Sequence, residues 1–478
     1  MKKITKKLLC VLLTAVLLSS SVLPTFAMSE FAWDFVWESD DAKAGLIMFV
    51  GSDETERNFT WYTPDENTPE VTVSSNILML DAETFTGTSE KATEGDYVNH
   101  VTIKGLEYGT TYYYKATSGD YESAVYSFTT AAENEFKAVY MTDIHITDDE
   151  ENPDSLCTTS FNFNNTLEDV LARENDVSLI LSAGDQATEG RAAEYKSFTV
   201  SPILKSIPVA TTIGNHDRKG AEYKTFANLP NEYEEAMISS YVGDNYWFVK
   251  GDVLFLVADT NNASGADHYE FVKKAVEANP DVKWRVMMAH HDLYSGRIPH
   301  RESENELLRL MWAPIVDEFA IDLVLLGHSH FYTVSNVLYN NKNVAPFAPE
   351  IVDPAGTVYM VSCSINRPRT EEELGLNEEI GFDYLTMEPT YNILTCSEDS
   401  ITVESYEVGA EDAFNSFTIK KTTNEGGHEY EESYFASIFN NLVRKIGTIY
   451  ALFNNIGRYN DLKEDGFDVN FFDCLLGK

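Results

Sequence analysis

The chain is poor in cysteine and in basic residues. Five cysteines are scattered over 478 residues, too few and too widely spaced for a disulfide framework, although the spacing leaves a Cys363–Cys396 pair open. Only 35 Lys and Arg stand against 77 Asp and Glu, a formal net charge of −42. Such an acidic chain repels nucleic acid and anionic membranes, so we expect neither as a partner. A solvated acidic surface is the favoured interpretation.

No apolar run is long enough to span a bilayer, which takes roughly 20 residues. The longest N-terminal run, from Leu8 to Leu18, is accompanied by four lysines and followed by a polar stretch that ends at Ala27. This pattern predicts a secretory signal at residues 1–27, cleaved after Ala27. We therefore expect a secreted chain, either free or associated with the cell surface, with no membrane span once the signal is removed.

Residues 30–132 predict an all-β sandwich. Short alternating runs, such as 59–63 and 101–103, are separated by polar turns, and a helical period is almost absent. The domain could form a wall of a substrate cleft or bind carbohydrate. A packing and spacing role is the favoured alternative.

Residues 135–421 alternate apolar strands with helical stretches at 165–173, 268–276 and 303–319. The runs 246–249 and 253–257 predict a hairpin. Five of the apolar strands end in Asp, Asn, Gly or His. If these strands lie parallel in one sheet, their carboxyl ends line one edge, where open α/β sheets build their sites. Six of the ten histidines lie at these ends, which chance does not explain.

The residues at the strand ends form the ligand set of a metal centre. Asp143 and His145 are two apart on extended chain, as are His328 and His330, so each pair should point to one side. With one shared carboxylate, the set offers four bonds to each of two ions. Mixed imidazole and carboxylate ligands suit Fe, Zn or Mn. The candidate ligands are Asp143, His145, Asp185, Asn215, His290, His328 and His330.

The five motifs, in this order, resemble the calcineurin-like metallophosphoesterases. They are Asp143-Ile-His145, Gly184-Asp185, Gly214-Asn215-His216-Asp217, His290 and Gly327-His328-Ser-His330. The β domain before them narrows the resemblance to the purple acid phosphatase-like branch, and its segment 106–112 resembles the tyrosine corner of fibronectin type III-like domains. The resemblance covers about residues 30–421. It implies a two-sheet β-sandwich flanked by helices.

The resemblance also implies individual roles. Asp185 would bridge two divalent or trivalent ions, one held with Asp143, His145 and His330 and the other with Asn215, His290 and His328. His216 would position the phosphate and act as the acid. His291 and Asp217 would support the ligands from outside. Arg297 and His300, in the loop after the fourth strand, are candidate substrate contacts, although loop residues of these types are more often simply solvated.

One position departs from the purple enzymes, which carry a Tyr ligand three residues after Gly-Asp and lack the His of Asp-x-His. Here that position is Thr188, and His145 is present. We therefore expect a colourless centre.

The function implied is that of a secreted dinuclear-metal phosphoesterase, which hydrolyses phosphate esters by attack of a metal-bound hydroxide. Its substrate would be a phosphorylated small molecule or peptide, and a phosphomonoesterase is favoured. A phosphodiesterase or nucleotidase on the same centre is the nearer alternative. A non-catalytic surface binding protein is the more distant one, because a relic domain would be expected to have lost ligands.

Two further segments follow the predicted catalytic domain. Residues 422–432 are polar, contain Gly426-Gly427 and predict a linker. In 433–478, apolar residues recur at helical spacing and predict an amphipathic helical segment. A helix folded back onto the catalytic domain is favoured over surface attachment or a partner contact.

Overall fold

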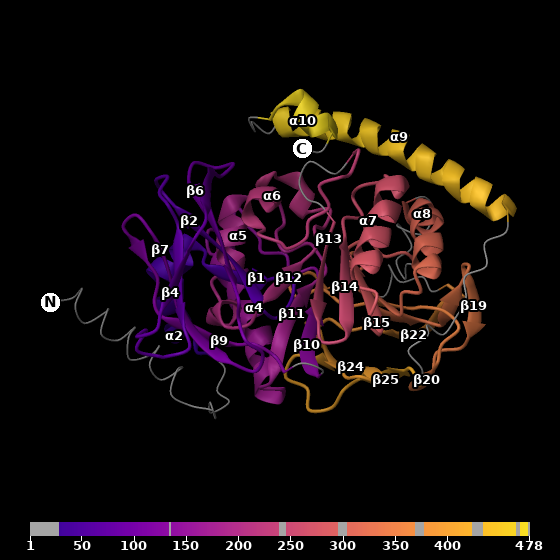
Figure 1. Cartoon of the computed structure of the whole chain (residues 1–478), viewed down its shortest axis with the longest axis horizontal. Helices are drawn as coiled ribbons and strands as arrows, with labels where there is room; N and C mark the ends of the chain where they lie inside the picture. Colours follow the sequence, from indigo (N-terminus) through magenta and orange to yellow (C-terminus); the bar gives the residue numbers. More distant parts are fainter. Residues whose placement is uncertain are drawn as a thin grey trace.

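The computed structural model describes residues 28–132, 135–238, 245–294, 304–368, 377–422, 434–464 and 469–476. Two large β-sheets carry the catalytic half of the chain, and helices cover their outer faces (Figure 1). A smaller β domain lies at the N-terminal side, and a long C-terminal helix lies across the outside of the molecule. The predicted fold class, an all-β domain followed by a two-sheet sandwich with flanking helices, is confirmed.

The larger sheet contains the first three motif strands side by side and parallel. They are β10 (Phe136–Met141), β11 (Val177–Ser182) and β12 (Val209–Thr211). Ile180 pairs with Val139 on one side and Val209 on the other. Beyond β10 the sheet continues through antiparallel strands and ends at a strand parallel to its neighbour; these are β23 (Thr390–Cys396), β24 (Ser400–Glu407), β25 (Asn415–Lys420) and β20 (Glu350–Val352).

The other two motif strands lie in a second, seven-stranded sheet. The prediction of a single sheet for all five is therefore wrong. This sheet runs in the order β13 (Tyr246–Lys250), β14 (Val253–Ala258), β15 (Trp284–Ala289), β16 (Leu323–Leu326), β21 (Val358–Val361), β17 (Tyr332–Ser335) and β22 (Ile380–Tyr384). The predicted β13–β14 hairpin is confirmed. A separate hairpin pairs β18 (Val337–Tyr339) with β19 (Lys342–Ala345).

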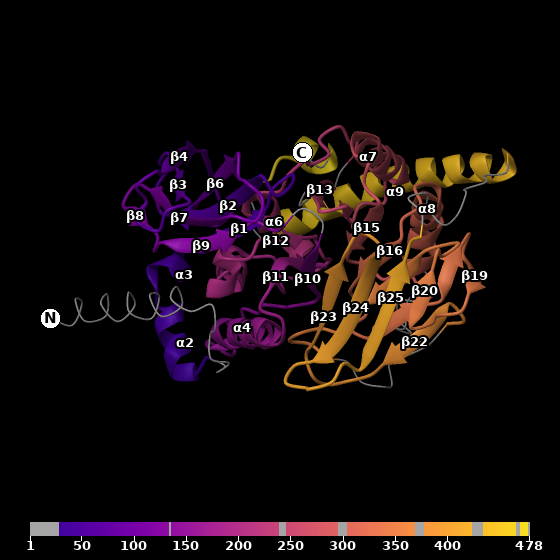
Figure 2. The ribbon, with the colours of Figure 1, turned by 60° about the horizontal axis from the view of Figure 1, so that its bottom comes forward.

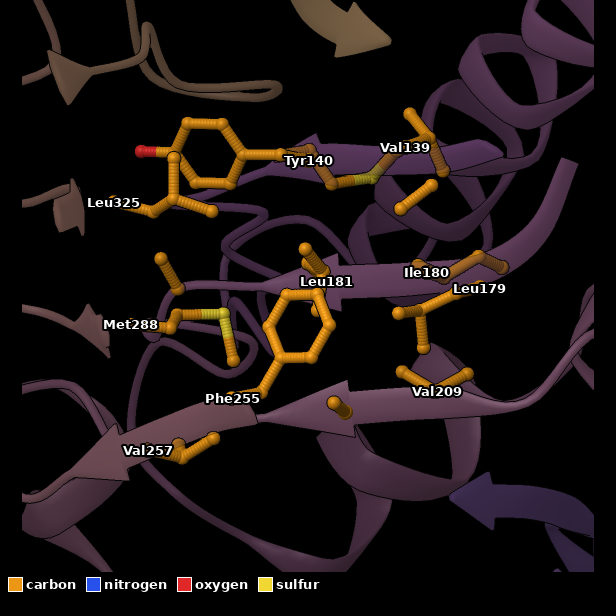
Figure 3. Packing of buried hydrophobic residues seen from close by; sticks show 14 of the residues in the cluster. Val139, Tyr140, Leu179, Ile180, Leu181, Val209, Phe255, Val257, Met288 and Leu325 are labelled. Carbon is orange, nitrogen blue, oxygen red and sulfur yellow. The ribbon is translucent and has the colours of Figure 1, made fainter. Parts of the chain in front are cut away.

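Apolar side chains fill the space between the two sheets (Figure 3). Val139, Leu179 and Leu181 of the larger sheet share one fully buried cluster with Phe255 and Met288 of the smaller one. Because the strands are buried on both faces, the sequence shows continuous apolar runs rather than alternation. This packing brings the carboxyl ends of strands from both sheets to one edge.

The helices pack on the outer faces. The larger sheet is flanked by α4 (Ser155–Arg173), with α5 (Ala192–Phe198) and α6 (Glu222–Phe226) beside it. The smaller sheet is covered by α7 (Gly265–Ala278) and α8 (Glu304–Glu318), whose Phe271 and Trp312 are fully buried. The three predicted helices therefore exist, the first with ten more residues at its start. The predicted N-terminal residue of α8, Ser303, lies outside the described residues.

The N-terminal domain is a sandwich of short strands, as predicted, but two helices precede it. These are α2 (Glu30–Trp37) and α3 (Asp40–Ala44), whose Ser29 and Ser39 caps accept hydrogen bonds from backbone N–H groups. The predicted tyrosine corner is present, because the Tyr112 hydroxyl accepts a hydrogen bond of 2.9 Å from the Glu107 N–H. The strands are β1 (Ile47–Val50), β2 (Glu56–Thr63), β3 (Glu70–Ser74), β4 (Glu83–Thr86), β5 (Thr88–Lys91), β6 (Tyr97–Lys104), β7 (Thr111–Ser118), β8 (Tyr121–Glu122) and β9 (Tyr126–Thr129).

The N-terminal domain is joined to the catalytic half by backbone and by charge. Strand β1 pairs with β12, so β1, β2, β6 and β5 extend the larger sheet. The buried Glu54 carboxylate adds an ionic link, because it contacts both Arg57, at 2.7 Å, and Lys250 of β13. Removing one partner of such a buried cluster would leave an uncompensated charge, typically at a cost of about 3–5 kcal/mol.

The chain ends in α9 (Tyr434–Glu464) and α10 (Phe471–Leu476), and α9 packs against α7 and α8 (Figure 2). Most of the predicted linker 422–432 lies outside the described residues, as does the predicted signal 1–27. Among the helices that the structure describes, none has the length and apolarity needed to cross a membrane. Cys363 and Cys396 are both buried free thiols and do not pair.

Candidate metal centre

The predicted ligands come together where the two sheets meet. Asp143 and His145 follow β10, Asp185 follows β11, Asn215 follows β12, and the remaining histidines follow β15 and β16. The prediction of extended chain at the paired motifs is wrong. Asp143, His145, Asp185, His328 and His330 all have φ between 51° and 71°. Left-handed backbone is costly for residues with a Cβ and clusters at functional sites.

Four of these residues form one compact group. A ligand atom from each of Asp143, His145, Asp185 and His330 lies within 4.8 Å of the others, and all four side chains are buried. The Nε2 atoms of His145 and His330 face each other at 3.3 Å. His330 Nε2 lies 3.0 Å from Asp143 Oδ1, and His145 Nε2 lies 3.6 Å from Asp185 Oδ2. These atoms surround a single point, as the ligands of one ion would.

A second group shares Asp185 with the first. The side-chain oxygen of Asn215 lies 2.8 Å from His328 Nδ1 and 3.1 Å from His290 Nε2. His290 Nε2 also lies 3.3 Å from Asp185 Oδ2, the oxygen that faces His145. One carboxylate oxygen therefore lies between the two groups.

Backbone carbonyls orient three of the imidazoles. The Nδ1 atoms of His290, His330 and His216 lie 2.8, 2.6 and 2.9 Å from the carbonyl oxygens of Ala183, Arg367 and Thr188. With Nδ1–H as the donor, Nε2 of each ring keeps its lone pair. Such hydrogen bonds fix the tautomer of a metal-binding histidine. In His290 and His330, Nε2 points into the cluster, toward Asn215 Oδ1 and Asp143 Oδ1 respectively.

The glycines of the motifs allow the strands to approach this closely. A Cβ on Gly214 would lie 2.0 Å from Asp185 Oδ1, and one on Gly327 would lie 2.0 Å from the Thr142 hydroxyl and 2.7 Å from Asp143 Oδ2. Either methyl group would displace a carboxylate of the cluster. The Gly-Asn and Gly-His patterns are thus required by the space beside the carboxylates.

Asp217 holds the loop that carries Asn215 and His216. Its buried carboxylate accepts hydrogen bonds from the N–H of Gly214 at 2.8 Å, the N–H of Ala187 at 3.0 Å and the Tyr195 hydroxyl at 2.8 Å. Burial and the charge of Asp185 raise the pKa of Asp217 to about 7. Through these hydrogen bonds, the Asp217 carboxylate links the loop after β11 to the loop after β12. The supporting role expected of Asp217 remains a prediction.

The charges of the cluster fit metal ions. Asp143 Oδ1 is buried between two imidazoles, 3.0 Å from His330 Nε2 and 3.8 Å from His145 Nε2. Burial alone would raise the pKa of Asp143, but the charge and hydrogen bond of His330 lower it to about 2. For His290, burial lowers the pKa, but Asp185 outweighs this effect and raises the pKa to about 10. Buried negative charge on the carboxylates is stabilised here by neighbouring positive charge, which bound cations would supply. Imidazole, carboxylate and amide donors together suit Zn, Fe or Mn.

The cluster opens to solvent on one side. Asp143, His145, Asp185 and His290 are fully buried, whereas Asn215 and His216 are partly exposed. The His216 ring packs edge-on to His145, with centroids 4.8 Å apart, and its backbone N–H donates to Asp185 Oδ1. Thr188 hydrogen-bonds to Thr147 through its hydroxyl at 2.9 Å. His291 is buried behind the cluster, where its Nδ1 lies 2.8 Å from the Thr260 hydroxyl.

The two predicted substrate contacts, Arg297 and His300, lie outside the described residues. The structure instead brings Arg367 to the site, which no motif indicated. Its segment is fixed to the first motif, because Ser364 donates to the Asp143 carbonyl at 2.6 Å and Asn366 to the Ile144 carbonyl at 2.7 Å. Burial lowers the pKa of His145 and of His216, and the Arg367 charge lowers both further.

A two-sheet sandwich with this Asp, Asn and His cluster at its strand ends defines a metallophosphoesterase. Sequence comparison agrees: the calcineurin-like phosphoesterase family matches residues 136–332, and the purple acid phosphatase N-terminal domain matches residues 45–130. The two matches together cover more than half of the chain. The chain therefore belongs to the calcineurin-like metallophosphoesterases, metal-dependent phosphoric ester hydrolases, with an N-terminal domain of the purple acid phosphatase type.

The relatives are distant. Purple acid phosphatase 1 of Ipomoea batatas is 26% identical over 55% of this chain and 58% of its own length. A probable cyclic nucleotide phosphodiesterase of Xenorhabdus bovienii is 23% identical over 54% of this chain and 99% of its own length. The structure of the purple acid phosphatase PPD1 from yellow lupin (Lupinus luteus) superposes with a TM-score of 0.67, at 17% identity, over 82% of this chain and 77% of that one. The chain thus spans just over half of the plant enzyme it matches in sequence, and the structural likeness shows the fold alone.

Proposed function

We propose that the protein is a phosphomonoesterase that works with two metal ions and acts outside the cell. The observation that carries this proposal is the sharing of Asp185 Oδ2 between two ligand groups. Two ions in these positions would supply positive charge for the phosphate and activation of water. The signal-like segment 1–27 supports export.

The residues of the open side fit the remaining tasks. Asn215 and His216 stand where a phosphate ester can enter, and the fully buried residues lie behind them. Thr188 fixes Nδ1 of His216, and no described residue hydrogen-bonds to Nε2. When the ring is protonated, Nδ1–H still donates to the Thr188 carbonyl, and Nε2–H can pass its proton to the leaving oxygen of the ester, the role of a general acid.

A phosphodiesterase on the same centre is the second candidate, supported by the match to the probable cyclic nucleotide phosphodiesterase. The two are separated by assaying the purified protein with Zn, Mn and Fe on alkyl monoesters, nucleotides, and linear and cyclic diesters. We expect the highest kcat/KM on monoesters. Faster turnover of diesters under every metal would reject the monoesterase assignment.

Arg367 is expected to bind the substrate phosphate. Its guanidinium has no acidic or hydrogen-bonding partner among the described residues, and its charge reaches His145 and His216. A hydrogen bond to a charged group contributes about 1.5–3 kcal/mol. Arg367→Ala should thus raise KM for monoesters roughly 10- to 100-fold and weaken inhibition by inorganic phosphate, with partial recovery in Arg367→Lys. Unchanged KM and phosphate inhibition would place Arg367 outside the substrate site.

The centre is expected to be colourless when loaded with iron. Thr188 has no phenol oxygen to ligate iron, and its hydroxyl is engaged by Thr147. We expect the visible spectrum of the iron-loaded protein to lack the charge-transfer band of a Tyr–Fe³⁺ bond, with the metal-free protein as the reference. A purple sample would mean that another tyrosine reaches the metal.

A further inference from the structure

Helix α9 is attached to the body through small and polar residues. Gly447 packs so closely on the Ala263 carbonyl that a Cβ would lie 2.2 Å from its oxygen. The Arg444 guanidinium lies 3.9 Å from the centre of the Tyr269 ring, and Thr448 lies 3.1 Å from the Ser264 hydroxyl. The helix is therefore held in place without using most of its large apolar side chains.

The opposite face of α9 is apolar and exposed. Its large side chains have between 49% and 65% of their surface accessible, whereas a helix folded onto a body usually buries this face. In Figure 1, α9 runs along the outside of α7 and α8. The residues of this outer face are Ile438, Phe439, Leu442, Ile446, Ile449, Tyr450 and Phe453.

Six of the apolar residues of α9 follow a heptad, and Ile438 and Tyr450 flank it. Phe439, Leu442, Ile446, Ile449, Phe453 and the partly exposed Ile456 recur at spacings of three and four residues. This 3.5-residue period is the pattern of a helix that packs along another helix. A helix lying on a lipid surface needs no such period and usually carries Lys and Arg on its polar side.

We propose that this face binds the same face of a second copy of the chain, with the two α9 helices antiparallel. The row of heptad residues from Phe439 to Ile456 is complementary to itself about a two-fold axis between Gly447 and Thr448, as an isologous interface requires. About that axis, Ile446 meets Ile449 of the other copy, Leu442 meets Phe453, and Phe439 meets Ile456. Each of these pairs brings together two apolar side chains, and no pair consists of two aromatic rings.

The charge distribution favours self-association at this helix. Each copy carries a formal net charge of −42, so most surfaces of two copies repel each other. From Tyr434 to Asn460, however, α9 contains no Asp or Glu. Arg444 and Arg458 are directed to the body, where Arg458 donates to the Lys219 and Gly220 carbonyls. Lys445 is the one exposed charge in this part of the helix.

The area is sufficient for a stable pair. The seven exposed side chains, each about half accessible, offer on the order of 600 Å² per copy, or about 1,200 Å² for both. Stable interfaces bury about 1,200–2,000 Å² in total. Helix α10, which packs against α9 through Tyr459 and Phe471, exposes Phe471, Phe472 and Leu476 and can add to this area.

Sedimentation of the purified metal-loaded protein tests the proposal. We expect a dimer at micromolar concentration, a monomer for Ile446→Asp, and a dimer for Asn441→Asp, which adds the same charge at an exposed polar position of the same helix. The melting temperature and activity of each variant report its folding. A monomeric wild type would overturn the proposal. If that monomer sediments with phosphatidylglycerol vesicles, the exposed face of α9 binds lipid instead of a second copy.

Cysteine cross-linking tests the antiparallel register. Two copies of residue 442 would lie about 16 Å apart along the helix axis, since the rise is about 1.5 Å per residue. Disulfides require Cα atoms within about 7 Å. Leu442→Cys alone and Phe453→Cys alone should therefore give no linked dimer, whereas a mixture of the two variants should. Cross-linking of Leu442→Cys with itself would overturn the antiparallel pairing.

Discussion

Asp185→Ala is expected to lose both metal ions and to reduce phosphate ester hydrolysis to background. Asp185 Oδ2 lies 3.6 Å from His145 Nε2 and 3.3 Å from His290 Nε2, so it faces both ligand groups. Its removal deletes a ligand from each ion and leaves the imidazoles without the charge that balances them. Metal content per chain and turnover of a phosphate monoester measure the two losses.

His330→Ala is the matched control, because His330 contacts only the first group, at Asp143 and His145. It should weaken one ion and leave the other bound. Melting temperatures of both variants, with excess metal, show whether the fold survives. An Asp185→Ala protein that keeps one tightly bound ion would reject the bridging role.

His216→Ala is expected to keep both metals and to lose roughly 10²- to 10⁴-fold in kcat on alkyl phosphates. His216 is partly exposed beside the cluster, its Nδ1 is bound to Thr188, and its ring contacts His145 only edge-on. A general acid matters most when the leaving oxygen is a poor leaving group. The loss on an aryl ester such as nitrophenyl phosphate should therefore be smaller.

The comparison of the two ester types separates proton transfer from binding. Equal losses on alkyl and aryl esters would assign His216 to phosphate positioning. Loss of a metal ion would make it a ligand. His291→Ala serves as the matched control, since His291 is a neighbouring but buried imidazole that hydrogen-bonds to Thr260. We expect His291→Ala to reduce kcat by the same factor on alkyl esters and on aryl esters.

The positions of the ligands could be predicted because each motif follows an apolar strand. The runs before Asp143, Asp185 and Asn215 are buried on both faces, and such strands are recognisable in sequence. Residue type then gave the chemistry. The two helices at 30–44 were missed because they are short and lie in a segment rich in aromatic residues, where strand and helix patterns overlap.

The local geometry of the site could not be predicted in the same way. The left-handed backbone at Asp143 and His328 depends on contacts between strands, such as the 2.8 Å hydrogen bond from the His328 N–H to Asp143 Oδ2. Arg367 reaches the site through the segment after β21, far from any motif. The exposed side of α9 was also hidden, because periodicity shows an apolar face but not what it packs against.

Each chain is expected to hold a centre of two metal ions, and metal analysis of the purified wild type tests this expectation most directly. After loading with Zn, Mn or Fe and removal of free metal, we expect two equivalents of metal per chain. We also expect about one equivalent in His330→Ala and none in Asp185→Ala. A wild-type protein that binds one equivalent or none under all three metals would contradict the account.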